Sequence, residues 1–273
     1  FLQRKQFTNE SAWEKLLGYI FRKESVLNYN VNKLARWSGF SYMTDCSAFH
    51  FSISKGSHQP YWEGNPPRDS ELNIIKSYIA KTKRNKTFLD VGGHIGTMSI
   101  PFSLMYDNVH AFEPCETNYK FLIGNIKINE VDNVHAHNVA VSNRASKVSV
   151  FKHPMPRGHR HNSGCYAIKD DSEGLVDCIT LDSLDFADVD FIKIDVQGKE
   201  SEVLEGAINT IRKYKPLLMI EVTDKEQTEE SLKGFATLKK QIVEFLSEED
   251  YVIYYDNGSD IFMCTEEITH VRH

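Results

Sequence analysis

The sequence predicts a doubly wound α/β fold, in which a mostly parallel sheet carries helices on both faces. Three observations support this fold class. From Thr87 onward, short apolar runs alternate with segments whose apolar residues have helical spacing. Several of the apolar runs end in an acidic residue. This is expected for parallel strands that all end at the same edge of a sheet, where ligands bind. Two strand-like segments close the chain and predict a terminal antiparallel pair.

The individual elements follow from these patterns. Runs such as Phe191–Asp195 predict buried strands, and the apolar residues of 199–211 recur on one helical face. The expected strands occupy 87–91, 108–113, 134–141, 147–151, 176–181, 191–195, 217–221, 251–255 and 260–264. The expected helices occupy 71–79, 96–105, 116–128, 199–211 and 230–246. A basic linker is expected at 81–86 and a polar loop at 153–171.

The first 70 residues differ in character from the rest. Helical spacing predicts helices over 11–22 and 31–37, and alternation predicts a strand over 48–53. Residues 56–67 are rich in Gly, Pro and aromatic side chains, which indicates a loop. We therefore predict a small α+β extension or cap over 1–70 and a main domain over 71–273. Because the chain begins at Phe1, we expect it to be part of a longer product.

Composition excludes several classes of protein. The 273 residues are 41% hydrophobic and 26% charged, as in globular domains, and the net charge of −6 argues against a general nucleic-acid binder. No apolar run approaches the roughly 18 residues of a membrane-spanning helix, and no signal peptide is recognisable. The five cysteines are scattered without metal-ligand spacing. We expect a cytoplasmic protein without a bound metal.

The segment Thr87–Gly96 is the main functional signal. An apolar run containing Asp90 is followed by Gly92, Gly93 and Gly96, which predicts a strand, a tight turn and a helix start that can approach a ligand closely. The next strand ends in Glu113, an acid that can accept hydrogen bonds from ribose hydroxyls. Four acids are expected at one sheet edge, and together they would line a crevice: Asp90, Glu113, Asp195 and Glu221.

The glycine spacing distinguishes between cofactors. A dinucleotide site prefers Gly-x-Gly-x-x-Gly, whereas this chain fits Asp-x-Gly-x-x-x-Gly with Asp90, Gly92 and Gly96. A carboxylate before the turn repels pyrophosphate and suits a ligand that carries an ammonium and a sulfonium. The pattern therefore favours S-adenosylmethionine over NAD.

Six ordered motifs between residues 87 and 222 carry a family resemblance. They are FLDVGGHIG at 88–96, AFEP at 111–114, NVAVS at 138–142, ITLDSL at 179–184, FIKIDVQGKE at 191–200 and EGA at 205–207. In this order and spacing the chain resembles the FkbM family of S-adenosylmethionine-dependent methyltransferases. His94 stands where the family commonly has Asn, and Gln197 where Glu is common.

The resemblance implies a class I methyltransferase fold, Rossmann-like with a seven-stranded sheet, and O-methylation of sugars or natural products. By position, Asp90, Gly92 and Gly96 would hold the methionine end of the cofactor, and Glu113 the ribose. Asn138 and Val139 would flank the adenine, and Asp195 would lie near the reactive methyl group. The further cofactor contacts expected in the same motifs are Gly93, His94, Thr97 and Pro114.

Methyl transfer to a hydroxyl needs a proton acceptor, for which the sequence offers two sources. Asp195 and Glu221 follow strands, and His161 lies in a loop unusually rich in His and Arg. Arginines suit an anionic group on the acceptor, and the aromatic pair in 56–67 could stack on a sugar ring. The expected acceptor contacts are His153, Arg157, His159, Arg160, Asn162, Tyr61 and Trp62.

Alternatives remain at this point. An RNA 2′-O-methyltransferase would use the Arg and His loop to bind phosphates, but Glu221 stands where such enzymes would place a second lysine, and the chain is acidic. A cofactor-binding module without catalysis is a third possibility. The favoured acceptor is a hydroxylated sugar, glycan or related small molecule.

Overall fold

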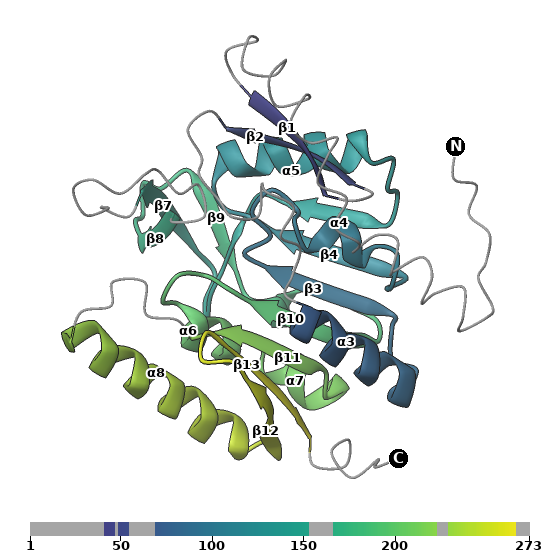
Figure 1. The fold of residues 1–273 in the computed structure, drawn as a ribbon. Helices are drawn as coiled ribbons and strands as arrows, with labels where there is room; N and C mark the ends of the chain where they lie inside the picture. The colour runs from purple at the N-terminus through teal and green to yellow at the C-terminus, as the bar shows by residue number, and fades with distance from the viewer. Residues whose placement is uncertain (1–40, 47–48, 55–68, 153–165, 223–228, 266–273) are drawn as a thin grey trace.

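The computed structural model describes residues 41–46, 49–54, 69–152, 166–222 and 229–265. A seven-stranded sheet with the order β12-β13-β11-β10-β3-β4-β5 forms its centre (Figure 1). The strands are β3 (Thr87–Val91), β4 (Asn108–Phe112), β5 (Val134–His137), β10 (Val189–Ile194), β11 (Leu217–Glu221), β12 (Tyr251–Asp256) and β13 (Asp260–Thr265). Only β13 runs against its neighbours β11 and β12. The predicted terminal antiparallel pair is thus confirmed.

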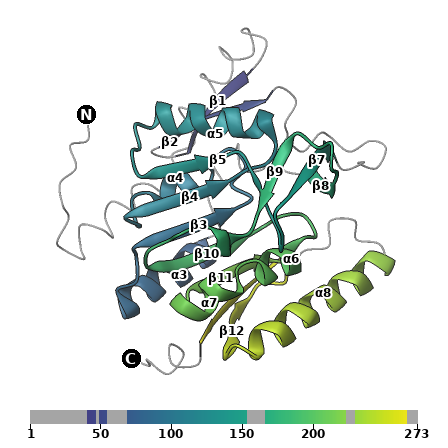
Figure 2. The same ribbon diagram turned by 180° about the vertical axis from the view of Figure 1, so that it is seen from behind.

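Helices cover both faces of this sheet (Figures 1 and 2), and an apolar layer lies between the sheet and the helices on each face. On one face, Phe88 and Phe191 pack with α3 (Asp69–Thr82), α4 (Ser99–Phe102) and α5 (Glu116–Ile128). On the other, Leu89 and Ile192 pack with α6 (Glu200–Glu205), α7 (Ile208–Tyr214) and α8 (Glu229–Ser247). Neighbouring strand residues face opposite layers, so the predicted double winding is confirmed.

A second, four-stranded sheet corrects two expectations. Its order is β6-β9-β7-β8, and it contains β6 (Ala140–Val141), β7 (Ser146–Lys152), β8 (Tyr166–Asp170) and β9 (Val176–Ile179), which is followed by the short helix η2 (Leu181–Ser183). The prediction of one strand over 134–141 is wrong, because β5 and β6 belong to different sheets. The predicted loop over 153–171 contains β8, which pairs with β7 in a hairpin.

Two predicted helices are shorter or interrupted. Of the helix expected over 96–105, only α4 is helical. Gly96 has a positive φ of 92°, so the helix does not begin there, and the Ser103 hydroxyl donates a hydrogen bond to the Ile100 carbonyl oxygen near its end. The helix expected over 199–211 is split into α6 and α7 around Gly206. A Cβ at Gly206 would lie 2.0 Å from the Ser142 carbonyl oxygen, so the backbone at Gly206 packs directly against the backbone at Ser142.

The N-terminal region is only partly described. The strand expected over 48–53 is β2 (Phe49–Ser54), which pairs antiparallel with β1 (Ser41–Cys46) and lies against α5 (Figure 1). The helices expected over 11–22 and 31–37 and the loop over 56–67 lie outside the described residues. The division at residue 70 stays a prediction. Within the described ranges, no helix has the length and apolar character to cross a bilayer.

Candidate active site at the carboxyl edge of the sheet

Four acidic residues meet at the carboxyl edge of the central sheet. Asp90 lies in β3, Glu113 directly follows β4, Asp195 directly follows β10, and Glu221 ends β11. These four strands are parallel, so the prediction that their acids share one edge is confirmed. Asp90, Asp195 and Glu221 each lie an even number of residues from Phe88, Phe191 and Leu217, respectively, along the same strands. Since side chains alternate between the two sides of a strand, these three acids lie on the α3-α4-α5 face.

The glycine turn connects β3 to both neighbouring strands. Gly92 N and Gly93 N donate to the Phe112 carbonyl oxygen at 3.0 and 2.9 Å. Gly92 has φ +86°, and a Cβ there would lie 1.9 Å from the Asp195 carbonyl oxygen. His94 also has a positive φ, 51°. Glycine at position 92 therefore permits the close approach of the β3 turn to the end of β10.

Asp90 is a buried carboxylate with one oxygen lacking a hydrogen-bond donor. Ser99 Oγ donates to Asp90 Oδ2 at 2.5 Å. Oδ1 accepts no hydrogen bond from the described residues, although Lys193 Nζ lies 3.3 Å away as an ion-pair partner. Such an oxygen can accept a charge-assisted hydrogen bond from a ligand ammonium.

Glu113 is held by backbone amides. Its Oε2 accepts from His94 N and its Oε1 from Cys115 N, both at 2.9 Å. Burial raises the pKa of Glu113 to about 7, although these two amides act to lower it. Asn138 Nδ2 donates to the Glu113 carbonyl oxygen at 2.8 Å. The carboxylate and the Asn138 loop are thus fixed to the same turn.

Asp195 and Glu221 are joined by a side-chain amide. Gln197 Nε2 donates to Asp195 Oδ1 at 2.7 Å and to Glu221 Oε2 at 3.1 Å. Gln197 has φ +62°, so the backbone after β10 turns sharply and directs this amide between the two acids. Asp195 keeps 32% of its side-chain surface exposed. A partly exposed carboxylate at a sheet edge can accept a proton from a hydroxyl.

The remaining predicted residues fall into two groups. Thr97, Pro114 and Val139 are half-buried in the segments that carry the glycine turn, Glu113 and Asn138. The predicted acceptor contacts and the predicted base His161 lie outside the described residues: His153, Arg157, His159, Arg160, Asn162, Tyr61 and Trp62. The structure therefore places the expected cofactor residues together and leaves the expected acceptor loop as a prediction.

Sequence reasoning missed two polar residues that contact Asp90. Lys193 sits in the apolar run before Asp195, and Ser99 begins α4. Strand alternation places Lys193 on the same side as Asp195, which was a usable signal. Which residue lies beside Lys193 on the next strand depends on the register between β10 and β3. In the structure this register places Lys193 opposite Asp90.

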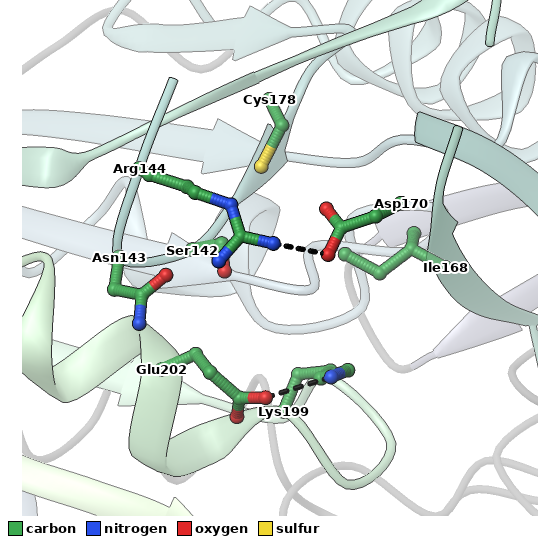
Figure 3. Close-up of a pocket in the computed structure, with 8 residues that line it drawn as sticks. All are labelled: Ser142, Asn143, Arg144, Ile168, Asp170, Cys178, Lys199 and Glu202. Carbon is green, nitrogen blue, oxygen red and sulfur yellow. Dashed lines mark hydrogen bonds and ion pairs between the residues drawn. The ribbon is translucent and has the colours of Figure 1, made fainter. Parts of the chain in front are cut away.

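A separate pocket of about 270 Å³ lies between the four-stranded sheet and α6 (Figure 3). Its charged side chains pair with one another, Arg144 with Asp170 at 2.5 Å and Lys199 with Glu202 at 2.7 Å. None of the predicted site residues lines it. Among the described residues, no group of three His, Cys, Asp or Glu side chains has the geometry of a metal site.

The sheet order defines the class of protein. A seven-stranded sheet with a single antiparallel strand next to one edge, and a glycine turn after its first parallel strand, is the class I methyltransferase fold. The family model described as "Methyltransferase FkbM domain" matches residues 90–253. The chain belongs to the FkbM methyltransferase family, and S-adenosylmethionine is the methyl donor of this family. A search of curated proteins finds no match.

Solved structures resemble the chain at low identity. The FkbM methyltransferase from Methylobacillus flagellatus is 20% identical over 66% of this chain and 44% of its own, with a TM-score of 0.44. A putative caffeoyl-CoA O-methyltransferase from Staphylococcus aureus is 14% identical over 72% of this chain and 84% of its own, with a TM-score of 0.47. The chain spans less than half of the M. flagellatus protein. These values support no inference about substrate.

Proposed function

We propose that the chain is an O-methyltransferase that acts on a hydroxyl of a sugar, glycan or related small molecule. The observation that carries this proposal is the pair of acids, Asp195 and Glu221, joined by Gln197 beside the glycine turn. When bound, S-adenosylmethionine supplies an activated methyl group. The chain supplies the position of the acceptor and a carboxylate that accepts the proton lost by its hydroxyl. We assign this role to Asp195, with Glu221 beside it.

The residues at the edge fit the cofactor chemically. The buried Asp90 carboxylate, whose Oδ1 lies 3.3 Å from Lys193 Nζ, suits a cationic group such as the ammonium of the methionine end, and the Glu113 carboxylate suits ribose hydroxyls. We propose that Gly92, Gly93, His94, Gly96 and Thr97 form the turn that receives the cofactor. Pro114, Asn138 and Val139 would border its adenine, where Asn138 is fixed by the carbonyl of Glu113.

The carboxylates at the edge favour a neutral acceptor over RNA. Asp195 and Glu221 would repel a phosphate backbone, whereas RNA-binding surfaces are usually basic. We retain His161 as a second candidate base and Arg157 and Arg160 as acceptor contacts. We also propose a cytoplasmic location, which the free thiols of Cys115, Cys178 and Cys264 support.

The raised pKa of Glu113 predicts a pH-dependent affinity for S-adenosylhomocysteine. The protonated acid below pH 7 offers fewer acceptors to the ribose, so affinity should rise about tenfold from pH 6 to pH 8. Calorimetry across this range measures the change. The Glu113→Gln variant should bind more weakly and lose this pH dependence. An equal pH dependence in both proteins would remove Glu113 from the ribose site.

The acceptor class is tested by a screen with labelled methyl donor. We expect transfer to free sugars, glycosides or small hydroxylated compounds, and none to RNA oligonucleotides. Transfer to RNA alone would establish the RNA alternative. Binding of S-adenosylhomocysteine without transfer to any acceptor would favour a cofactor-binding module. No binding at all would contradict the proposed function.

A further inference from the structure

Lys193 is a buried cation in the middle of the candidate site. It lies on β10, where the register places it opposite Asp90 of β3 and Met219 of β11. Its side chain is only 10% exposed. Lysine is seldom buried to this extent unless it is paired, because the loss of hydration destabilises its ammonium. The surroundings of Lys193 therefore need to compensate a buried charge.

The Lys193 ammonium contacts both halves of the site. Nζ donates to the Gly92 carbonyl oxygen at 3.0 Å and lies 3.3 Å from Asp90 Oδ1, which are both on the cofactor side. It also lies 3.5 Å from Asp195 Oδ2, on the acceptor side. The other Asp195 oxygen, Oδ1, accepts from Gln197. One cation thus joins the glycine turn to the candidate base.

The charge balance shows why this cation matters. Burial acts to lower the pKa of Lys193, but Asp90, Asp195 and Glu221 together act to raise it, and the net result lies above its ordinary value. Lys193 is therefore an ammonium at neutral pH. Its removal would take a buried ammonium away from the carboxylates of three adjacent strands, which would then repel one another more strongly.

We propose that Lys193 is a positioning residue, whose ammonium fixes the glycine turn and Asp90 relative to the candidate base Asp195. This inference rests on the proposed function, since it concerns the same cofactor and acceptor site. It assigns to Lys193 no direct contact with the reacting atoms.

The test combines calorimetric binding of S-adenosylhomocysteine at pH 7 with thermal unfolding of the same variants. Lys193→Met should weaken binding by at least about tenfold, because the glycine turn and Asp90 lose the ammonium that joins them to the end of β10. Lys193→Arg retains the charge and should keep the affinity within about threefold of the wild type. Lys86→Met removes an exposed ion pair with Asp107 and serves as the control, with unchanged binding.

If Lys193 served only the stability of the fold, Lys193→Met would have a lower melting temperature, but the folded variant would bind with wild-type affinity. If that variant does not fold, Lys193→Gln provides the same test, because its amide can still donate to Gly92 without a charge. Wild-type affinity in the neutral variants would overturn the proposal while the proposed function stands. Failure of the wild-type protein to bind would overturn both.

Discussion

Replacement of Gly92 by alanine should strongly destabilise the protein at the carboxyl edge of the sheet. The new Cβ would lie 1.9 Å from the Asp195 carbonyl oxygen, and the backbone at 92 has φ +86°. The left-handed backbone costs about 1 to 2 kcal/mol for a residue with a side chain, and the overlap adds to this. We expect a total loss of about 4 kcal/mol or more and a melting temperature lower by about 10 °C. Thermal unfolding measures both.

Gly258 provides a matched control for this prediction. It has the same φ of +86°, but a Cβ there would have no neighbour within 4 Å. Gly258→Ala therefore measures the effect of the left-handed backbone alone and should lower the free energy of unfolding by only about 1 to 2 kcal/mol. Equal losses for the two variants would show that the close approach between Gly92 and Asp195 does not limit stability.

Replacement of Asp195 by asparagine should abolish most turnover. Asparagine can still accept the hydrogen bond from Gln197, but it cannot accept a proton from the acceptor hydroxyl. Loss of a general base typically lowers kcat about 10² to 10⁴-fold. Binding of S-adenosylhomocysteine should change by less than about tenfold, because Asp90 and Glu113 remain. Single-turnover rates on an acceptor identified by the screen measure the loss.

Glu221→Gln is the paired variant for the Asp195 experiment. If Asp195 is the base, Glu221→Gln should have the smaller effect on turnover. A larger loss in Glu221→Gln would transfer the role to Glu221. Wild-type turnover in both variants would exclude both carboxylates and leave His161 as the candidate to test.

The central strands were predictable because burial determines them locally. Runs such as 217–221 are apolar throughout, and the residue at the end is an acid, so both the strand and its edge follow from the sequence. The helices around Gly96 and Gly206 were not predictable to the same extent. Their lengths depend on a positive φ at Gly96 and on a contact between Gly206 and Ser142, which joins segments far apart in sequence.

The candidate site was predictable in its acids and not in its cation. Glu113 and Asp195 are recognisable from their places after apolar runs, and Asp90 from its place just before the glycine turn. Lys193 lies within such an apolar run, where a lysine only breaks the apolar pattern and indicates no function. Its importance depends on strand register, which brings it beside Asp90 from 103 residues earlier in the chain. Register is set by the assembled sheet, so no local pattern reports it.

The insertion of β13 has a consequence for synthesis of the chain. β13 follows β12 in sequence but lies between β11 and β12, and among the described strands β12 pairs only with β13. A nascent chain that ends before β13 therefore cannot attach β12 and leaves the backbone of β11 unpaired at an apolar edge. Such an edge can recruit strands from other nascent chains. We infer that β13, the last strand among the described residues, also protects the growing polypeptide from aggregation.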